Sequence, residues 1–164
     1  MRILGIDPGS RVTGFGIIDA DGSSLRLVAA GCIRSADGDF PTRLKIVYDG
    51  MLEVVSQYLP EVLAIEQVFV QKNADSALKL GQARGAAICA GLARKLPVYE
   101  YATRQIKQAL VGKGGADKQQ VQYMVKTLLN FRGELPLDAS DALAVAVCHA
   151  HYQQTFQRQA LGIA

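Results

Sequence analysis

Hydrophobic positions in the first third of the chain recur in the manner of strands. Apolar residues dominate three segments, and the short connections between them include the turn signal DADGSS. Short connections between consecutive strands are typical of antiparallel pairing. The pattern therefore predicts an antiparallel meander of three strands, at Ile3–Asp7, Val12–Ile18 and Leu25–Arg34.

The hydrophobic period then changes to three and four residues, which indicates an amphipathic helix from Leu44 to Leu59, ended by Pro60. The rest of the chain alternates short apolar runs with helical ones. It predicts strands at 62–66 (VLAIE) and 97–101 (PVYEY), and helices over 74–95, 103–111, 117–130 and 137–152. Thr103 and Asp117 are the expected N-caps of two of these helices. Residues 153–164 are expected to form a weak helix or a frayed, weakly ordered tail.

The resulting order is β-β-β-α-β-α-β-α-α-α. Two strands reached through helical crossovers join three antiparallel ones, which predicts an α/β fold: a mixed five-stranded sheet (three antiparallel plus two parallel strands) with helices on both faces. A length of 164 residues, 49% hydrophobic and 20% charged, fits one globular domain over 1–152 followed by the tail.

The chain shows no sign of a membrane or secreted protein. Its longest apolar stretches fall short of the roughly 18 residues that a membrane span needs. Met1 leads directly into a strand pattern, which leaves no room for a signal peptide. The three cysteines, Cys32, Cys89 and Cys148, are far apart in apolar runs, so we expect reduced core thiols. These features together predict a cytoplasmic protein.

Four acidic residues stand where the predicted fold brings segments together. Asp7 ends the first strand, and Glu66 ends the fourth. Asp138 and Asp141 lie three residues apart in the first turns of the last helix, so they share one face of it. Functional sites of open α/β sheets gather at strand ends beside a topological switch. We therefore expect one cluster of four carboxylates, provided that the last helix packs against that edge.

Such a cluster needs a cation, because like charges a few ångströms apart raise one another's pKa. Mg²⁺ prefers carboxylate and water oxygens, and the sequence has no His/Cys set at zinc spacing. Four carboxylates suit two Mg²⁺ ions, a recurring arrangement for phosphoryl transfer. Taken alone, Asp7 before Pro8-Gly9 is also typical of a turn. Asp138 and Asp141 alone are also typical of acidic residues that the helix dipole favours in a first turn. Glu66 is harder to explain that way, because its strand reads as buried.

The net charge of +3, from 18 basic and 15 acidic residues, is too small to indicate a polyanion partner by itself. If the four candidate ligands are set aside, 11 acidic residues remain against 18 basic ones, a balance of +7 that suits phosphate binding. Glycines in the loop GKGGAD would let backbone N–H groups approach phosphate. The candidate basic residues are Lys72, Lys79, Arg84, Arg104, Lys107, Lys113 and Lys118. Each of them alone is equally typical of a solvated surface.

Three separated segments resemble the RuvC family of bacterial Holliday-junction resolvases: GIDPGSRVTGFG, AIEQVFVQKNADSALKLGQARG and DASDALAVA. They agree with the family in content, order and spacing, and the resemblance runs to about residue 150. It implies a ribonuclease H-like fold and a homodimer that binds a four-way DNA junction. It also implies paired symmetric nicks in homologous recombination and DNA repair, two Mg²⁺ ions per subunit with Mn²⁺ as a substitute, and the branch-migration proteins RuvA and RuvB as partners.

The resemblance assigns roles to individual residues. It makes the four carboxylates the catalytic, metal-binding tetrad; some members carry His at the position of Asp141. It assigns Lys107 and Lys118 to DNA phosphates near the cut, and Phe69 to stacking on a base at the junction centre. Without the resemblance, Phe69 would be assigned to the core. The further DNA-binding candidates are Lys72, Arg104 and Lys113.

The expected mechanism uses one Mg²⁺, held by Asp7 and the helix acids, to activate water. A second ion, shared by Asp7 and Glu66, stabilises the leaving 3′-oxygen, so that 5′-phosphate and 3′-hydroxyl ends result. Small residues on the helix over 74–95 favour close packing, either in a dimer interface or on the sheet of the same subunit.

Three other classes of protein share some of these sequence features. Phosphotransferases of the actin–hexokinase superfamily share an Asp-x-Gly-Ser loop but need two such domains. YqgF-type RNA-processing nucleases have a similar opening but are usually shorter. A DNA-binding protein without catalysis would not need an intact acidic tetrad.

Overall fold

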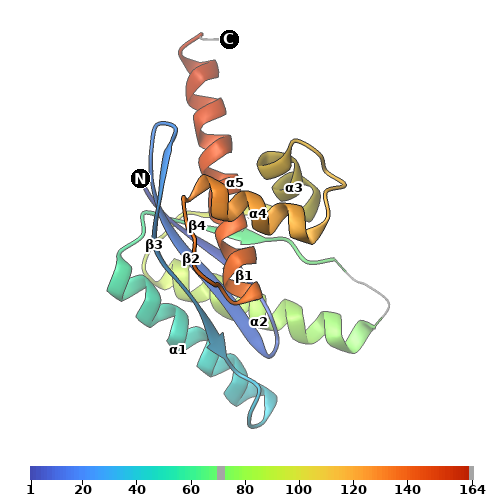
Figure 1. Cartoon of the computed structure of the whole chain (residues 1–164). Coiled ribbons are helices and arrows are strands. Elements are labelled where there is room, and N and C mark those ends of the chain that lie inside the picture. Colours follow the sequence, from blue (N-terminus) through green and yellow to red (C-terminus); the bar gives the residue numbers. More distant parts are fainter. Residues whose placement is uncertain (70–72, 163–164) are drawn as a thin grey trace.

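The computed structural model describes residues 1–69 and 73–162, and its elements follow the predicted order. The strands are β1 (Arg2–Asp7), β2 (Val12–Asp21), β3 (Ser24–Arg34), β4 (Val62–Glu66) and β5 (Val98–Tyr101). The helices are α1 (Phe40–Tyr58), α2 (Ala74–Ala93), α3 (Thr103–Val111), α4 (Lys118–Leu128) and α5 (Leu137–Ala160). Figure 1 shows their arrangement. The DNA-binding candidate Lys72 lies outside the described residues.

The five strands form one mixed sheet in the order β3-β2-β1-β4-β5. The pairs β1–β2 and β2–β3 are antiparallel, whereas β1–β4 and β4–β5 are parallel. This topology confirms the predicted combination of a three-stranded meander with two crossover strands. It also makes β1 the central strand, where the antiparallel half of the sheet meets the parallel half.

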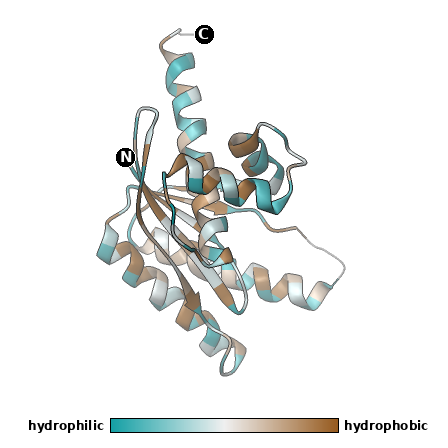
Figure 2. Cartoon of the chain, viewed as in Figure 1, coloured by the Kyte–Doolittle hydropathy of each residue, from teal (hydrophilic) through white to brown (hydrophobic). Residues whose placement is uncertain are grey.

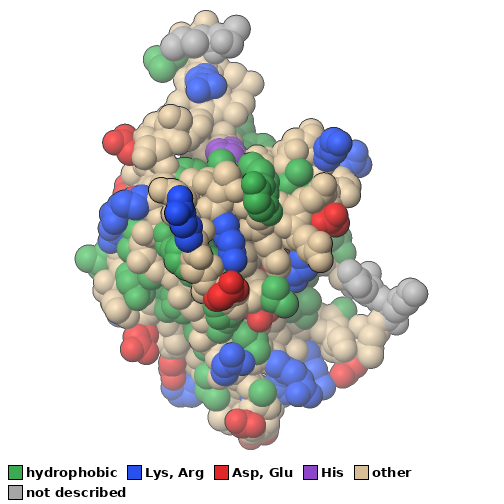
Figure 3. All heavy atoms as spheres, viewed as in Figure 1, with side chains coloured by type: hydrophobic (Ala, Val, Ile, Leu, Met, Phe, Trp, Pro, Cys, Tyr) green, Lys and Arg blue, Asp and Glu red, His purple; other side chains and the backbone are tan. Residues whose placement is uncertain are grey.

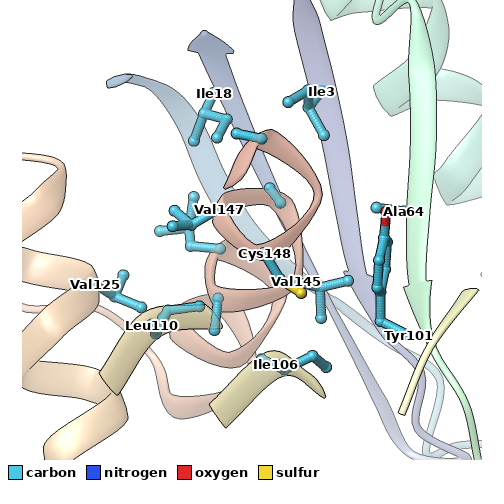
Figure 4. Close-up of a cluster of buried hydrophobic side chains, with 14 of the residues drawn as sticks. Ile3, Ile18, Ala64, Tyr101, Ile106, Leu110, Val125, Val145, Val147 and Cys148 are labelled. Atoms are coloured by element: carbon cyan, nitrogen blue, oxygen red, sulfur yellow. The ribbon is translucent and has the colours of Figure 1, made fainter. Parts of the chain in front are cut away.

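Side chains of β1 alternate between two cores, one on each face of the sheet. Leu4 and Ile6 pack with α1 and α2 on one face. Ile3 packs on the other face with side chains of α3, α4 and α5, and Figure 4 shows this second core around Val145 and Val147 of α5. The prediction of helices on both faces is therefore confirmed, with α5 lying directly against the sheet.

Glycines let the backbone of α5 approach the sheet closely. A Cβ on Gly14 would lie 1.9 Å from the carbonyl oxygen of Asp138, and a Cβ on Gly5 would lie 2.1 Å from that of Ala142. A Cβ on Gly16 would lie 2.6 Å from the Leu143 side chain. Any larger residue at these positions would push α5 outward, so the glycines fix where the helix begins.

Some boundaries differ from the predicted ones. The first helix begins at Phe40, ahead of its predicted start, because Asp39 caps it by accepting a hydrogen bond from the Thr42 N–H at 2.8 Å. The last helix continues past Tyr152 to Ala160. This extension is mostly exposed and polar, as its colour in Figure 2 shows, so periodicity gave no signal for it.

The expected N-cap of α3 was wrong: Ala102 is the cap, and Thr103 is the first helical residue. Asp117 does cap α4, in a capping box with Gln120. The cysteines are free thiols, but only Cys148 is a core residue; Cys32 is half-buried and Cys89 is exposed. None of the helices in the described part of the chain is both long and apolar enough to cross a membrane.

Candidate active site

The first two acids lie side by side at the ends of neighbouring parallel strands. Ile6 of β1 pairs in register with Ile65 of β4, so Asp7 and Glu66 each extend their strand by one residue beyond this pair. The loop after Asp7 is held in place, because the Thr13 hydroxyl donates to the Gly9 carbonyl at 3.1 Å. Both carboxylates are therefore mounted on buried strands at the predicted edge.

The other two acids reach this edge through α5. The close approach of Gly14 to the Asp138 carbonyl places the first turn of α5 over β2, and Gly14 is itself the register partner of Asp7. Asp141 lies three residues further along the helix. The packing of α5 thus positions both of its carboxylates near the β1–β4 pair.

Electrostatics show that the four carboxylates act on one another. The pKa of Asp7 is raised to about 7, mainly by burial and in addition by the negative charges of Asp141, Glu66 and Asp138. Burial also raises the pKa of Glu66, whereas the hydrogen bond that the Thr103 hydroxyl donates to Glu66 opposes this rise. Removal of Asp7 from water beside three acids is unfavourable unless a cation is close.

A cation does lie close: the Nζ atom of Lys118 is 2.7 Å from Oδ2 of Asp141. This hydrogen bond raises the pKa of Lys118, and the charges of Asp7 and Asp138 add to the effect. Among residues 1–69 and 73–162, no three Asp, Glu, His or Cys side chains are positioned to hold one metal ion jointly. The backbone therefore gathers the acids, while the Asp141 carboxylate contacts Lys118 and the Glu66 carboxylate contacts Thr103.

Two hollows flank Glu66 and Thr103, which line both. The larger, of about 570 Å³, is bounded by Asp7, by Phe69 and by the start of α2. The smaller, of about 300 Å³, is bounded by Lys107, Lys118 and Asp141, with residues of α3 and α4. The Phe69 side chain is 66% exposed, so the assignment to the core that the sequence alone suggested is wrong.

Two other basic candidates lie around the loop before α4. Arg104 is exposed and packs against Gly114 of the loop before α4, and Lys113 is exposed in that same loop. Neither of them lines the two hollows. Figure 3 shows Lys and Arg side chains dispersed among acidic ones on the visible face, including over the lobe of α3 and α4. On this face, therefore, basic side chains do not form one continuous patch.

Two positioning residues were missed or misassigned from the sequence. Thr103 was expected to cap a helix, but its hydroxyl instead donates to a Glu66 carboxylate oxygen. The sequence suggested Arg84 only as a basic residue for phosphate binding. In the structure its Nε donates to the Glu66 carbonyl at 2.9 Å, and its guanidinium pairs with Glu100. Both contacts join distant segments, so no local pattern could have revealed them.

Comparison with known proteins places this geometry. The family model "Crossover junction endodeoxyribonuclease RuvC" matches residues 3–149, which include all four carboxylates. The chain is 64% identical over 157 residues to crossover junction endodeoxyribonuclease RuvC of Methylococcus capsulatus, across 96% of this chain and 94% of the relative. The chain belongs to the RuvC family.

Solved RuvC structures share the fold. Thermus thermophilus RuvC superimposes with a TM-score of 0.88 at 33% identity, over 95% of this chain and 97% of that one. The T. thermophilus RuvC in complex with Holliday junction substrate gives 0.86 at 31% identity, over 94% and 96%. The ribonuclease H-like fold implied by the sequence motifs is confirmed, and RuvC membership overturns the phosphotransferase and YqgF-type alternatives.

Proposed function

We propose that this chain is a Holliday-junction resolvase, an endodeoxyribonuclease that nicks four-way junctions in pairs during homologous recombination and DNA repair. The observation that carries the proposal is the convergence of Asp7, Glu66, Asp138 and Asp141 on one edge of the sheet, in a chain of the RuvC family. A binding protein without catalysis would gain nothing from this arrangement, because half-buried acids so close together are unfavourable unless they hold a cation.

The tetrad fits divalent metal ions. Its donors are all carboxylates, the ligands that Mg²⁺ and Mn²⁺ prefer, and its central member, Asp7, has a pKa raised by burial and by the other three acids. We assign all four residues as ligands of two Mg²⁺ ions, for which Mn²⁺ can substitute. Such ions supply an activated water and charge stabilisation of the leaving oxygen in phosphodiester hydrolysis, leaving 5′-phosphate and 3′-hydroxyl ends. Thr103 and Arg84 hold Glu66 for this task.

Side chains around the tetrad suit a DNA backbone. Lys107 and Lys118 line the hollow beside Glu66 and Asp141, and we assign them to phosphates near the cut. Phe69 is exposed at the rim of the larger hollow, where its ring can stack on an unpaired base. The loop residue Lys113 and the neighbouring Arg104 would contact phosphates further along an arm. Lys72 keeps its proposed DNA contact on sequence grounds alone.

A homodimer suits a substrate with two-fold symmetry, since one active site then faces each of two opposed strands. Helix α2 offers a surface for it: Leu78 and Leu92 are 67% and 54% exposed, and Cβ atoms on Gly81 and Gly85 would meet nothing within 4 Å. We propose α2 as part of the interface, and light scattering at micromolar concentration would test it. Cooperation with RuvA and RuvB, and a cytoplasmic location, stay predictions.

The test uses a synthetic mobile four-way junction, labelled on each strand in turn. We expect symmetric nicks in opposed strands with Mg²⁺ or Mn²⁺, ends that ligase can seal, and no cleavage in EDTA. Asp7→Asn should abolish cleavage while junction binding changes little, because lysines carry most of the affinity. Lys45→Met is a control, since Lys45 is exposed on α1 and pairs with Asp49 on the same helix.

Two outcomes would contradict the proposal. Asp7→Asn protein that nicks junctions at the wild-type rate in Mg²⁺ would refute the metal site. Wild-type protein that binds junctions but leaves all four strands intact with either metal would indicate a binding protein instead.

A further inference from the structure

The Lys118 ammonium lies among the acids of the candidate active site, in the smaller hollow. A lysine that served only to contact DNA would not need to lie beside these acids. Its Nζ atom is 2.7 Å from Oδ2 of Asp141, and its charge also acts on Asp7, Glu66 and Asp138. The Lys118 charge thus interacts with all four carboxylates. Its position matches the electrostatic need that a divalent ion would otherwise meet.

The main chain of Lys118 is fixed at the start of a capped helix, whereas its side chain is long and largely exposed. Lys118 is the first residue of α4, directly after the capping box in which Gln120 N–H donates to Asp117 at 2.8 Å. The Lys118 side chain is 59% exposed, while that of Asp141 is 24% exposed. A long, exposed lysine on a rigid mount can leave its partner at low cost, since exposed ion pairs contribute little.

We propose that Lys118 is a resident counter-cation that competes with divalent metal ions for the carboxylate cluster. In the metal-free protein its ammonium neutralises Asp141 and lowers the repulsion among the four acids. Metal binding displaces the ammonium, which can then contact a DNA phosphate bound at the smaller hollow. The inference deepens the proposed function and rests on it, because it assumes that the tetrad binds metal.

Competition makes a prediction about metal affinity that a lysine serving only DNA would not make. Lys118→Met keeps the aliphatic stem and removes the charge. DNA-free Lys118→Met protein should bind Mn²⁺ about two- to fivefold more tightly than wild type, the range expected when an ion pair of this kind no longer has to be broken. Isothermal titration of Mn²⁺ into metal-free protein at pH 8 measures this directly, without any cleavage assay.

Lys107→Met separates direct competition from long-range charge. Lys107 lines the same hollow and its charge also acts on Glu66, but within the described part of the chain it forms no ion pair with an acid. We expect its loss to change Mn²⁺ affinity less than twofold. A second readout guards against misfolding: the rise in melting temperature on adding Mn²⁺ should be larger for Lys118→Met than for wild type or Lys107→Met.

The outcomes distinguish this inference from the proposed function. Lys118→Met protein that binds Mn²⁺ no more tightly than Lys107→Met protein would overturn the competition. If Asp7→Asn protein binds Mn²⁺ as tightly as wild type, the metal site itself is misassigned and the competition falls with it. Tighter binding by Lys118→Met alone, together with loss of binding in Asp7→Asn, supports both.

Discussion

The Asp7 carboxylate should make the metal-free protein less stable as pH rises, and replacing it should remove that penalty. Burial and three neighbouring acids raise its pKa from an ordinary value of 3.8 to about 7. The folded protein therefore keeps a proton on Asp7 between about pH 4 and pH 7, where the unfolded chain has lost it. Since the folded state binds the extra proton, stability falls as pH rises through this window and is constant above it.

The size of the effect follows from the shift. A change of about 3 pKa units corresponds to about 4 kcal/mol at most. Asp7 is only partly buried, so hydration of the carboxylate reduces the penalty, and about 2 kcal/mol is a reasonable expectation. For a domain of this size, that corresponds to about 4–8 °C in melting temperature. Asp7→Asn should gain this amount at pH 8, although it removes a proposed metal ligand.

Thermal melts in EDTA at pH 5 and pH 8 test the prediction. Asp7→Asn should melt several degrees above wild type at pH 8, and its advantage should be less than half as large at pH 5, because about two thirds of the window between pH 4 and pH 7 lies above pH 5. Adding Mg²⁺ at pH 8 should raise the melting temperature of wild type more than that of the variant. Asp21→Asn, at an exposed position at the end of β2, is the control and should show no pH-dependent difference from wild type.

The decisive quantity is the difference between variant and wild type, because other groups also titrate in this range. A difference that is equal at pH 5 and pH 8, or a variant that melts below wild type at pH 8, would refute the electrostatic description of the site.

Three further substitutions test the packing of α5 on the sheet, the DNA contact of Phe69 and a buried hydrogen bond of the core. Gly14→Ala should lower stability by about 2 kcal/mol or more and reduce cleavage, because its Cβ would meet the α5 backbone, whereas Gly115→Ala adds a Cβ in open space; melts and cleavage assays check both. Phe69→Ala should weaken junction binding by about 1–3 kcal/mol in fluorescence anisotropy without lowering the melting temperature. Tyr101→Phe should cost about 1–2 kcal/mol in urea unfolding, because its hydroxyl is 2.7 Å from Nδ1 of buried His149.

The sheet and its helices could be predicted because periodicity and turn chemistry are local. The mixture of antiparallel and parallel strands followed from the short connections within the meander and the long helical crossovers on either side of the strand that ends at Glu66, whereas the order of the five strands comes from the structure. The start of α1 could also have been predicted, since Asp39 and Pro41 are a cap and a first-turn proline; counting hydrophobic period alone missed them. The polar end of α5 could not, because an exposed helix carries no apolar stripe.

The candidate site was predictable to the level of which strand ends and which helix carry the acids. Its internal contacts were not, because they depend on side-chain directions between distant segments. Thr103 reads as a helix cap and instead bonds to Glu66, and Lys118 reads as a DNA contact and lies on Asp141. Cys89 reads as a core thiol because its run is apolar, but it lies on the outer face of α2.

The acidic cluster persists because its backbone is fixed independently of its charges. Mutual repulsion would favour moving α5 away from β1, yet Gly5 and Gly14 lie against the α5 backbone, and the α5 residues from Ala139 to Ala150 are all buried apart from Asp141. Moving the helix would expose this whole core, which is a far larger loss than the repulsion of a few kcal/mol. Repulsion is therefore relieved by protonating Asp7 or by a nearby cation such as Lys118, rather than by a movement of the helix.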